Sequence, residues 1–69
     1  MTTIEVRVSK ATLVQWGNSV HAANFVMSEL VKRGVPVAGA LFPTGIERGR
    51  IVIEEDAFGD DIIYTWEDN

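Results

Sequence analysis

The spacing of hydrophobic and polar positions changes along the chain. Over residues 3–8 the two kinds alternate, so Ile4, Val6 and Val8 would share one side of an extended backbone and the charged residues between them the other. A period of two with β-branched residues is typical of a strand with one buried and one solvated face. We therefore expect the first strand over these residues.

From residue 10 to residue 33 the spacing becomes helical. Apolar residues three and four apart would form one stripe along such a helix: Leu13, Trp16, Val20, Ala23, Met27 and Leu30. Ser9 or Thr12 is the expected N-cap, because a hydroxyl there can accept from an unpaired amide of the first turn. Gly34 follows the last turn and is the expected left-handed C-cap.

Gly17, Asn18 and Ser19 interrupt this helical pattern. Three poor helix formers in a row cost roughly 1–2 kcal/mol relative to alanine. The alternative to one long helix is a separate helix over 20–33 capped by Ser19, with residues 10–16 as a short turn or strand. In both cases the architecture depends on a helix over 20–33 that buries its apolar stripe.

Three further segments are predicted to be strands. Residues 35–42 form a continuous apolar run, typical of a buried strand. Residues 50–55 and 61–67 are rich in β-branched and aromatic side chains. The turn between these two contains Gly59, at a position expected to need a positive φ.

The resulting order is β-α-β-β-β, which predicts an α+β fold: one amphipathic helix packed on a mostly antiparallel four-stranded sheet. The last three strands would form a meander, and the first would reach the second through the helix. The length of 69 residues corresponds to a single domain, residues 1–69.

Composition narrows the possibilities further. The chain has no cysteine, which excludes disulfides, thiolate zinc sites and a thiol nucleophile, and favours a cytoplasmic protein. It contains no apolar stretch long enough to span a membrane. We expect no membrane association.

The net charge of −4 is unevenly distributed. Residues 1–46 carry four cations and two anions, whereas residues 47–69 carry two cations and eight anions. An acidic last third repels phosphate backbones and attracts basic partners. This balance disfavours nucleic acid as a partner and favours a protein with a basic surface patch, although acidic turns also simply keep small proteins dispersed.

The acidic and aromatic residues around the last turn are the predicted partner-binding site: Glu54, Glu55, Asp56, Phe58, Asp60, Asp61, Tyr64 and Trp66. Tyr64 and Trp66 are two apart and share one face of a strand. On the inner face they would belong to the core, and on the outer face they would be a hot spot for protein binding. A plain solvated acidic turn is the alternative for the carboxylates.

No constellation in the sequence is typical of an active site. The carboxylates near the last turn do not match a calcium-binding loop, and His21 is the only histidine. Gly45 and Gly49 bracket a loop that matches no phosphate-binding pattern. We predict no catalytic residues, no metal and no cofactor, and therefore a protein that is not an enzyme, with a small enzyme subunit as the least favoured alternative.

One local resemblance concerns two segments. Residues 14–19 read Val-Gln-Trp-Gly-Asn-Ser, and residues 47–54 read Glu-Arg-Gly-Arg-Ile-Val-Ile-Glu. These resemble the start and end of the swapped-hairpin AbrB/MazE family of dimeric DNA-binding antitoxins and regulators. The resemblance implies a strand over 13–18, duplex binding, and an acidic tail over 54–69 that engages a toxin.

The chain departs from that family at two places. Gln15 stands where the family has a basic residue, and residues 22–25 lack the arginine and proline of the family's strand. Without those arginines, contact with phosphates would be weak.

The favoured hypothesis is a non-enzymatic protein-binding module that occupies a basic surface of its partner. In size and charge it is similar to phage-type inhibitors of host defence, such as anti-CRISPR and anti-restriction proteins. An AbrB/MazE-like antitoxin is the alternative. A homodimer is also expected, because the apolar strand over 35–42 carries few charges that would prevent edge pairing.

Overall fold

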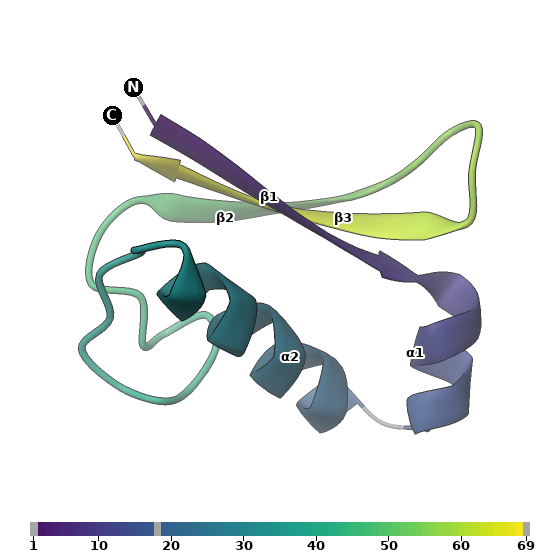
Figure 1. The fold of residues 1–69 in the computed structure, drawn as a ribbon, viewed down its shortest axis with the longest axis horizontal. Helices are drawn as coiled ribbons and strands as arrows, with labels where there is room; N and C mark the ends of the chain where they lie inside the picture. Colours follow the sequence, from purple (N-terminus) through teal and green to yellow (C-terminus); the bar gives the residue numbers. More distant parts are fainter. Residues whose placement is uncertain (1, 18, 69) are drawn as a thin grey trace.

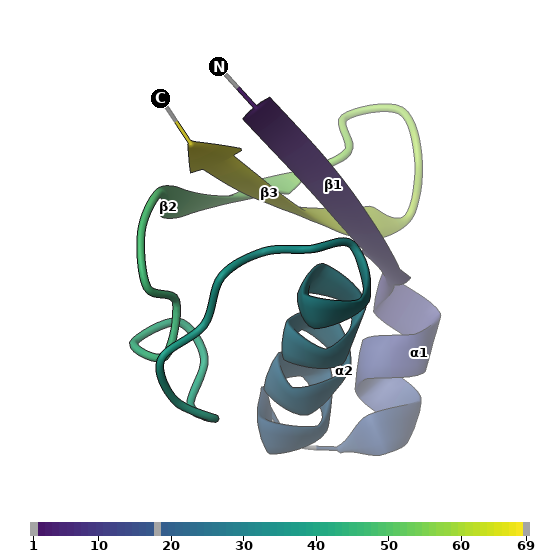
Figure 2. The same ribbon diagram turned by 60° about the vertical axis from the view of Figure 1, so that its left-hand side comes forward.

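The computed structural model describes residues 2–17 and 19–68, and it confirms an α+β fold. Its elements follow in this order: β1 (Thr2–Ser9), α1 (Lys10–Trp16), α2 (Ser19–Lys32), β2 (Arg50–Glu55) and β3 (Asp61–Asp68). Both helices lie on the same face of the sheet, and the other face is open (Figures 1 and 2). No helix in the described ranges is long and apolar enough to cross a membrane.

The sheet has three strands in the order β1-β3-β2, and both pairings are antiparallel. The first and last strands are therefore neighbours along their whole length, and the two ends of the chain lie close together (Figure 1). The predicted four strands and the predicted β-α-β-β-β order are wrong. The predicted parallel pairing of residues 3–8 with residues 35–42 does not form, because residues 35–42 are not a strand and β1 pairs with β3 instead.

The missing strand is residues 35–42, which belong to a long loop between α2 and β2. Within this loop Val37 and Ile46 form an isolated antiparallel bridge. The amide of Ala38 donates to the Gly45 carbonyl (2.7 Å). Part of the apolar run therefore pairs its backbone groups inside the loop and not with a strand of the sheet.

The long helix is interrupted where the sequence is weakest. Gly17 adopts a left-handed φ of 76°, and its amide donates to the Leu13 carbonyl (3.3 Å), so α1 ends there. Ser9 is confirmed as the N-cap of α1, since its Oγ accepts from the Thr12 amide (3.1 Å). The separate second helix is therefore right, but residues 10–16 are helical and not a turn or strand. Capping by Ser19 concerns a side chain outside those described.

At its other end α2 is followed by the predicted glycine cap. Gly34 has a φ of 94°, and the amide of Val35 donates to the Leu30 carbonyl (3.0 Å). This is a Schellman motif, in which the residue after the glycine packs back on the last turn. Val35 and Leu30 are both buried in the core.

The buried face of α2 differs from the predicted stripe. Val26 is completely buried, and Ala22, Met27 and Leu30 are buried with it, whereas Val20 is 62% exposed. Because the helix is interrupted at Gly17, the rotation of α2 about its own axis is independent of α1. The apolar stripe therefore does not continue from α1 into α2. The prediction that Val20 is a core residue is therefore wrong.

The core lies between the inner face of the sheet and α2. Its buried residues are Val6, Val8, Val26, Leu30, Val35 and Trp66. Leu13 and Trp16 of α1 pack against it from the side, and the Trp16 ring lies 5.6 Å from that of Phe25, which joins α1 to α2. Trp66 keeps its indole nitrogen paired, donating to the Arg48 carbonyl at 2.9 Å.

Two matched substitutions on α2 test this buried face. We expect Val26→Ala to lower the free energy of unfolding by about 2 kcal/mol, because it removes fully buried methyl groups. Val20→Ala makes the same chemical change at an exposed site and should shift it by less than about 0.5 kcal/mol. Urea denaturation monitored by circular dichroism measures both values. Equal effects would contradict the burial pattern.

Candidate functional site

The predicted binding residues centre on the hairpin between β2 and β3. Residues 54–61, here called the acidic hairpin, lie at the end of the sheet away from the chain termini (Figure 1). The amide of Asp56 donates to the Asp61 carbonyl (3.0 Å), which closes the hairpin. Its turn is therefore anchored to a paired strand on each side.

A side-chain hydrogen bond shapes the turn. Asp56 Oδ1 accepts from the amide of Phe58 at 3.1 Å, an arrangement that mimics a backbone turn. Gly59 does not have the positive φ predicted for it. Its role is steric, because a Cβ there would lie 2.7 Å from Asp56 Oδ2. The turn thus depends on the close approach of Gly59 to the Asp56 carboxylate.

A cation from β1 connects to both sides of the turn. The Arg7 guanidinium lies 3.2 Å from Asp56 Oδ2 and 3.6 Å from Asp61 Oδ2, and it also pairs with Glu5 at 3.5 Å. The negative charge of Glu5 is the main cause that raises the pKa of Arg7. The hydrogen bond to Asp56 and the charges of Asp56 and Asp61 raise it further. A guanidinium is charged across the working pH range in any case, so these ion pairs depend only on the carboxylates being ionised.

Lys10, the first residue of α1, makes a second connection. Its Nζ lies 3.4 Å from Glu55 Oε2, and its amide donates to the Asp60 carbonyl at 2.6 Å. Sequence reasoning missed both Lys10 and Arg7, because their part in the site depends on β1 pairing with β3. The sequence shows the alternating charges of β1, but it does not show which strand β1 pairs with.

The predicted site residues divide into three groups by exposure. Phe58 is fully exposed in the turn, and Glu54, Glu55 and Asp60 are exposed in the same hairpin. Asp56 and Asp61 are half-buried beneath Arg7. All of these residues belong to the acidic hairpin, and Asp56 and Asp61 both contact Arg7.

The third group consists of the two aromatic residues of β3, which face inward. Trp66 is 3% exposed and belongs to the core. Tyr64 is half-buried against the core, with its ring 6.1 Å from that of Phe42 in an edge-on contact. The inner-face alternative is therefore the correct one. Trp66 offers no surface to a partner, and its assignment to the binding site is corrected here.

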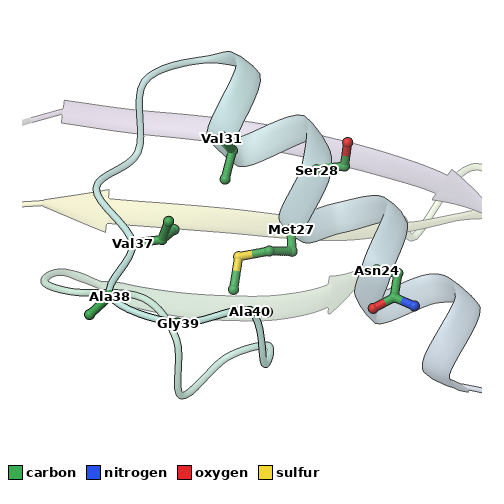
Figure 3. Close-up of a pocket in the computed structure, with 8 residues that line it drawn as sticks. All are labelled: Asn24, Met27, Ser28, Val31, Val37, Ala38, Gly39 and Ala40. Carbon is green, nitrogen blue, oxygen red and sulfur yellow. The ribbon is translucent and has the colours of Figure 1, made fainter.

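A concave feature lies between α2 and the long loop (Figure 3). It is an open groove of about 480 Å³, lined by Asn24, Met27, Ser28, Val31, Val37, Ala38, Gly39 and Ala40. Met27 reaches across it from α2 toward the loop (Figure 3). Its lining contains no titratable side chain, so it can hold an apolar group but offers no acid or base.

The other candidate positions form no chemical centre in the described parts of the chain. His21 lies exposed on α2. Arg48 and Arg50, near Gly49, pair with Asp68 and Glu67 at 3.0 and 2.9 Å. Within residues 2–17 and 19–68, no group of three or more His, Cys, Asp or Glu side chains is placed to hold a metal ion.

Comparison with known protein families, curated proteins and solved structures finds no match to this chain. The AbrB/MazE resemblance implies a strand over 13–18, but the structure has the α1 helix up to Trp16 and a left-handed cap at Gly17. The fold and the site thus define a small α+β protein whose most distinctive exposed feature is the acidic hairpin.

Two substitutions of Asp56 separate its two contacts. Asp56→Asn keeps a side-chain oxygen for the Phe58 amide but loses the charge paired with Arg7, so the stability loss should stay below about 1 kcal/mol. Asp56→Ala loses both contacts, and we expect the Phe58 amide to exchange with solvent several-fold faster than in Asp56→Asn. Hydrogen exchange measured by NMR tests this. Equal exchange rates in the two variants would show that the side chain does not hold the turn.

Proposed function

We propose that this protein is a non-enzymatic protein-binding module whose acidic hairpin docks on a basic surface patch of a partner protein. The observation that carries the proposal is Phe58, a fully exposed aromatic side chain in an anchored turn of the acidic hairpin. Burying such a side chain in a partner's pocket contributes about 1.5–3 kcal/mol. Aromatic anchors are typical of binding hot spots.

The turn has side-chain contacts within the chain itself. Asp56, Arg7 and Lys10 fix it through the contacts described above. A preorganised loop loses little conformational entropy on binding, so more of the contact energy contributes to affinity. This supports a docking role over that of a simple solvated turn.

The remaining charge supports a cationic partner. Arg7 and Lys10 neutralise only part of the acidic hairpin, which carries five carboxylates. Glu54 and Asp60 are both exposed in the hairpin that carries Phe58. Carboxylates at the rim of an interface accelerate and orient association with a basic surface.

A basic patch that can receive such a hairpin can also bind nucleic acid. The proposed consequence is inhibition by occupancy, in which the hairpin covers a surface that would otherwise contact phosphates. Anti-CRISPR and anti-restriction proteins, to which the chain is similar in size and charge, provide the functional model. The cytoplasm, where nucleic-acid-handling proteins work, is the proposed compartment.

Hairpin variants with matched controls test this proposal. We expect Phe58→Ser to weaken binding at least about tenfold through the loss of the buried ring. The double variant with Glu54→Gln and Asp60→Asn should slow association and reduce its dependence on salt. The partner is the protein captured from lysate by the wild type, and the binding rates of the wild type and of each variant are then measured on purified proteins by surface plasmon resonance.

The controls make equivalent changes outside the hairpin. Leu41→Ser removes an exposed apolar side chain in the long loop, and Glu47→Gln removes an exposed carboxylate there. Both should bind like the wild type. Weakening by the controls as strong as that by the hairpin variants, or retardation of duplex DNA by the wild type at low salt, would contradict the proposal.

A further inference from the structure

β2 lies at an edge of the sheet and carries a charge gradient along its length. It begins with Arg50 and ends with Glu54 and Glu55. Edge strands present unpaired backbone groups and are ready to pair with another strand. An antiparallel copy of β2 would bring the cationic start of one strand beside the acidic end of the other, whereas a parallel copy would align like charges.

The cross-strand register shows which residues share a face. Arg50 lies opposite Glu67, Val52 opposite Thr65 and Glu54 opposite Ile63, all on the open face of the sheet. Because side chains alternate along a strand, Ile51 and Ile53 point to the helical face. The open face of β2 therefore carries Arg50, Val52 and Glu54, and its helical face carries Ile51 and Ile53.

We propose that two copies of this chain form a two-fold dimer in which their β2 strands pair antiparallel, with Val52 opposite the partner's Val52. This pairing places Arg50 opposite the partner's Glu54 on the open face, and the symmetry repeats the contact. On the helical face, Ile51 lies opposite the partner's Ile53. The proposal is independent of what the acidic hairpin binds.

Other registers fit less well. A shift by one residue sets the open face of one copy against the helical face of the other. A shift by two places Val52 against the partner's Glu54 or Arg50 and separates the two ion pairs. Over residues 50–54 the register centred on Val52 sets charge against opposite charge and apolar against apolar, and Glu55 then lies opposite the partner's Gly49.

Arg50 can pair with two carboxylates at the same time. Its Nε donates to Glu67 Oε1 at 2.9 Å within the chain, yet its side chain is 75% exposed. A guanidinium carries further N–H donors beyond Nε, arranged to meet a second carboxylate. The partner's Glu54 would be that second carboxylate.

The helical face of β2 is incompletely covered by its own chain. Ile53 is 58% exposed. Beside it lies a depression of about 280 Å³, lined by Ala22, Ala23, Phe42, Ile53 and Tyr64. In the proposed dimer the partner's Ile51 lies across from Ile53 and removes apolar surface from water.

The opposite edge of the sheet is a poorer candidate, although β1 also has a charge of each sign on its open face. Val6 and Val8 are only 3% and 4% exposed, so a new strand would bury little more of them. Arg7 is already paired with carboxylates of the acidic hairpin. The apolar surface and the available charge both favour β2.

The dimer would have a continuous sheet in the order β1-β3-β2-β2-β3-β1. Because the central strands are antiparallel, the two acidic hairpins would point to opposite ends of it. Their mutual repulsion would be small at physiological salt, where screening is strong beyond about 8 Å. Each copy would present its Phe58 separately.

Charge reversals at the two ends of β2 give a specific test. Arg50→Glu places like charges opposite each other at both symmetric positions, and so does Glu54→Arg. We expect either variant alone to raise the dimer dissociation constant at least about tenfold. An equimolar mixture of the two variants restores opposite charges at every position and should form a heterodimer at concentrations where each alone is a monomer.

Sedimentation equilibrium over a concentration series, with one variant carrying a fluorescent label, measures these states. Lys32→Glu and Asp60→Arg make the same changes in net charge away from β2 and should dimerise like the wild type. Circular dichroism checks that each monomer is folded. A wild type that stays monomeric, a mixture that does not associate, or single variants that dimerise as well as the controls would each overturn the proposal.

Discussion

The pairing of β1 with β3 is the interaction on which the rest of this structure depends. It joins the first strand to the last in unbroken register from Thr2 and Asp68 to Ser9 and Asp61. With β2 on its other side, β3 becomes the central strand, and the inner side chains of β1 and β3 supply the surface that α2 covers. Without this pairing the chain would have an isolated hairpin, which is at best marginally stable in water.

The same pairing sets the electrostatics of the acidic hairpin and the position of the free edge. It carries Arg7 to Asp56 and Asp61, and it starts α1 where Lys10 meets Glu55. A turn that the sequence presents as a run of repelling carboxylates is thereby given two cations that order it. Because β1 occupies one side of β3, β2 is left at the edge, where its charge gradient is accessible to another strand.

The long loop and the helix break show how tertiary contacts override local patterns. The apolar run over 35–42 has the composition of a buried strand, but it lies outside the sheet, and the amides of Ala38 and Gly39 donate to the Gly45 carbonyl within the loop. It contributes one wall of the groove beside α2 instead. Gly17 likewise ends α1, so the single predicted helix is replaced by two helices with different rotations about their axes. As a result Val26 is buried and Val20 is exposed.

By itself the sequence determined the features that rest on local chemistry. These were the alternation in β1, the caps at Ser9 and Gly34, the hairpin of β2 and β3, and the exposed acidic tip with Phe58. The tertiary structure alone decided the order of the strands, the inward orientation of Trp66 and the pairing of Arg7 with the hairpin. Those features depend on which distant segments of the chain come into contact. The spacing of hydrophobic residues specifies which face of an element is buried, but it does not specify which other element covers that face.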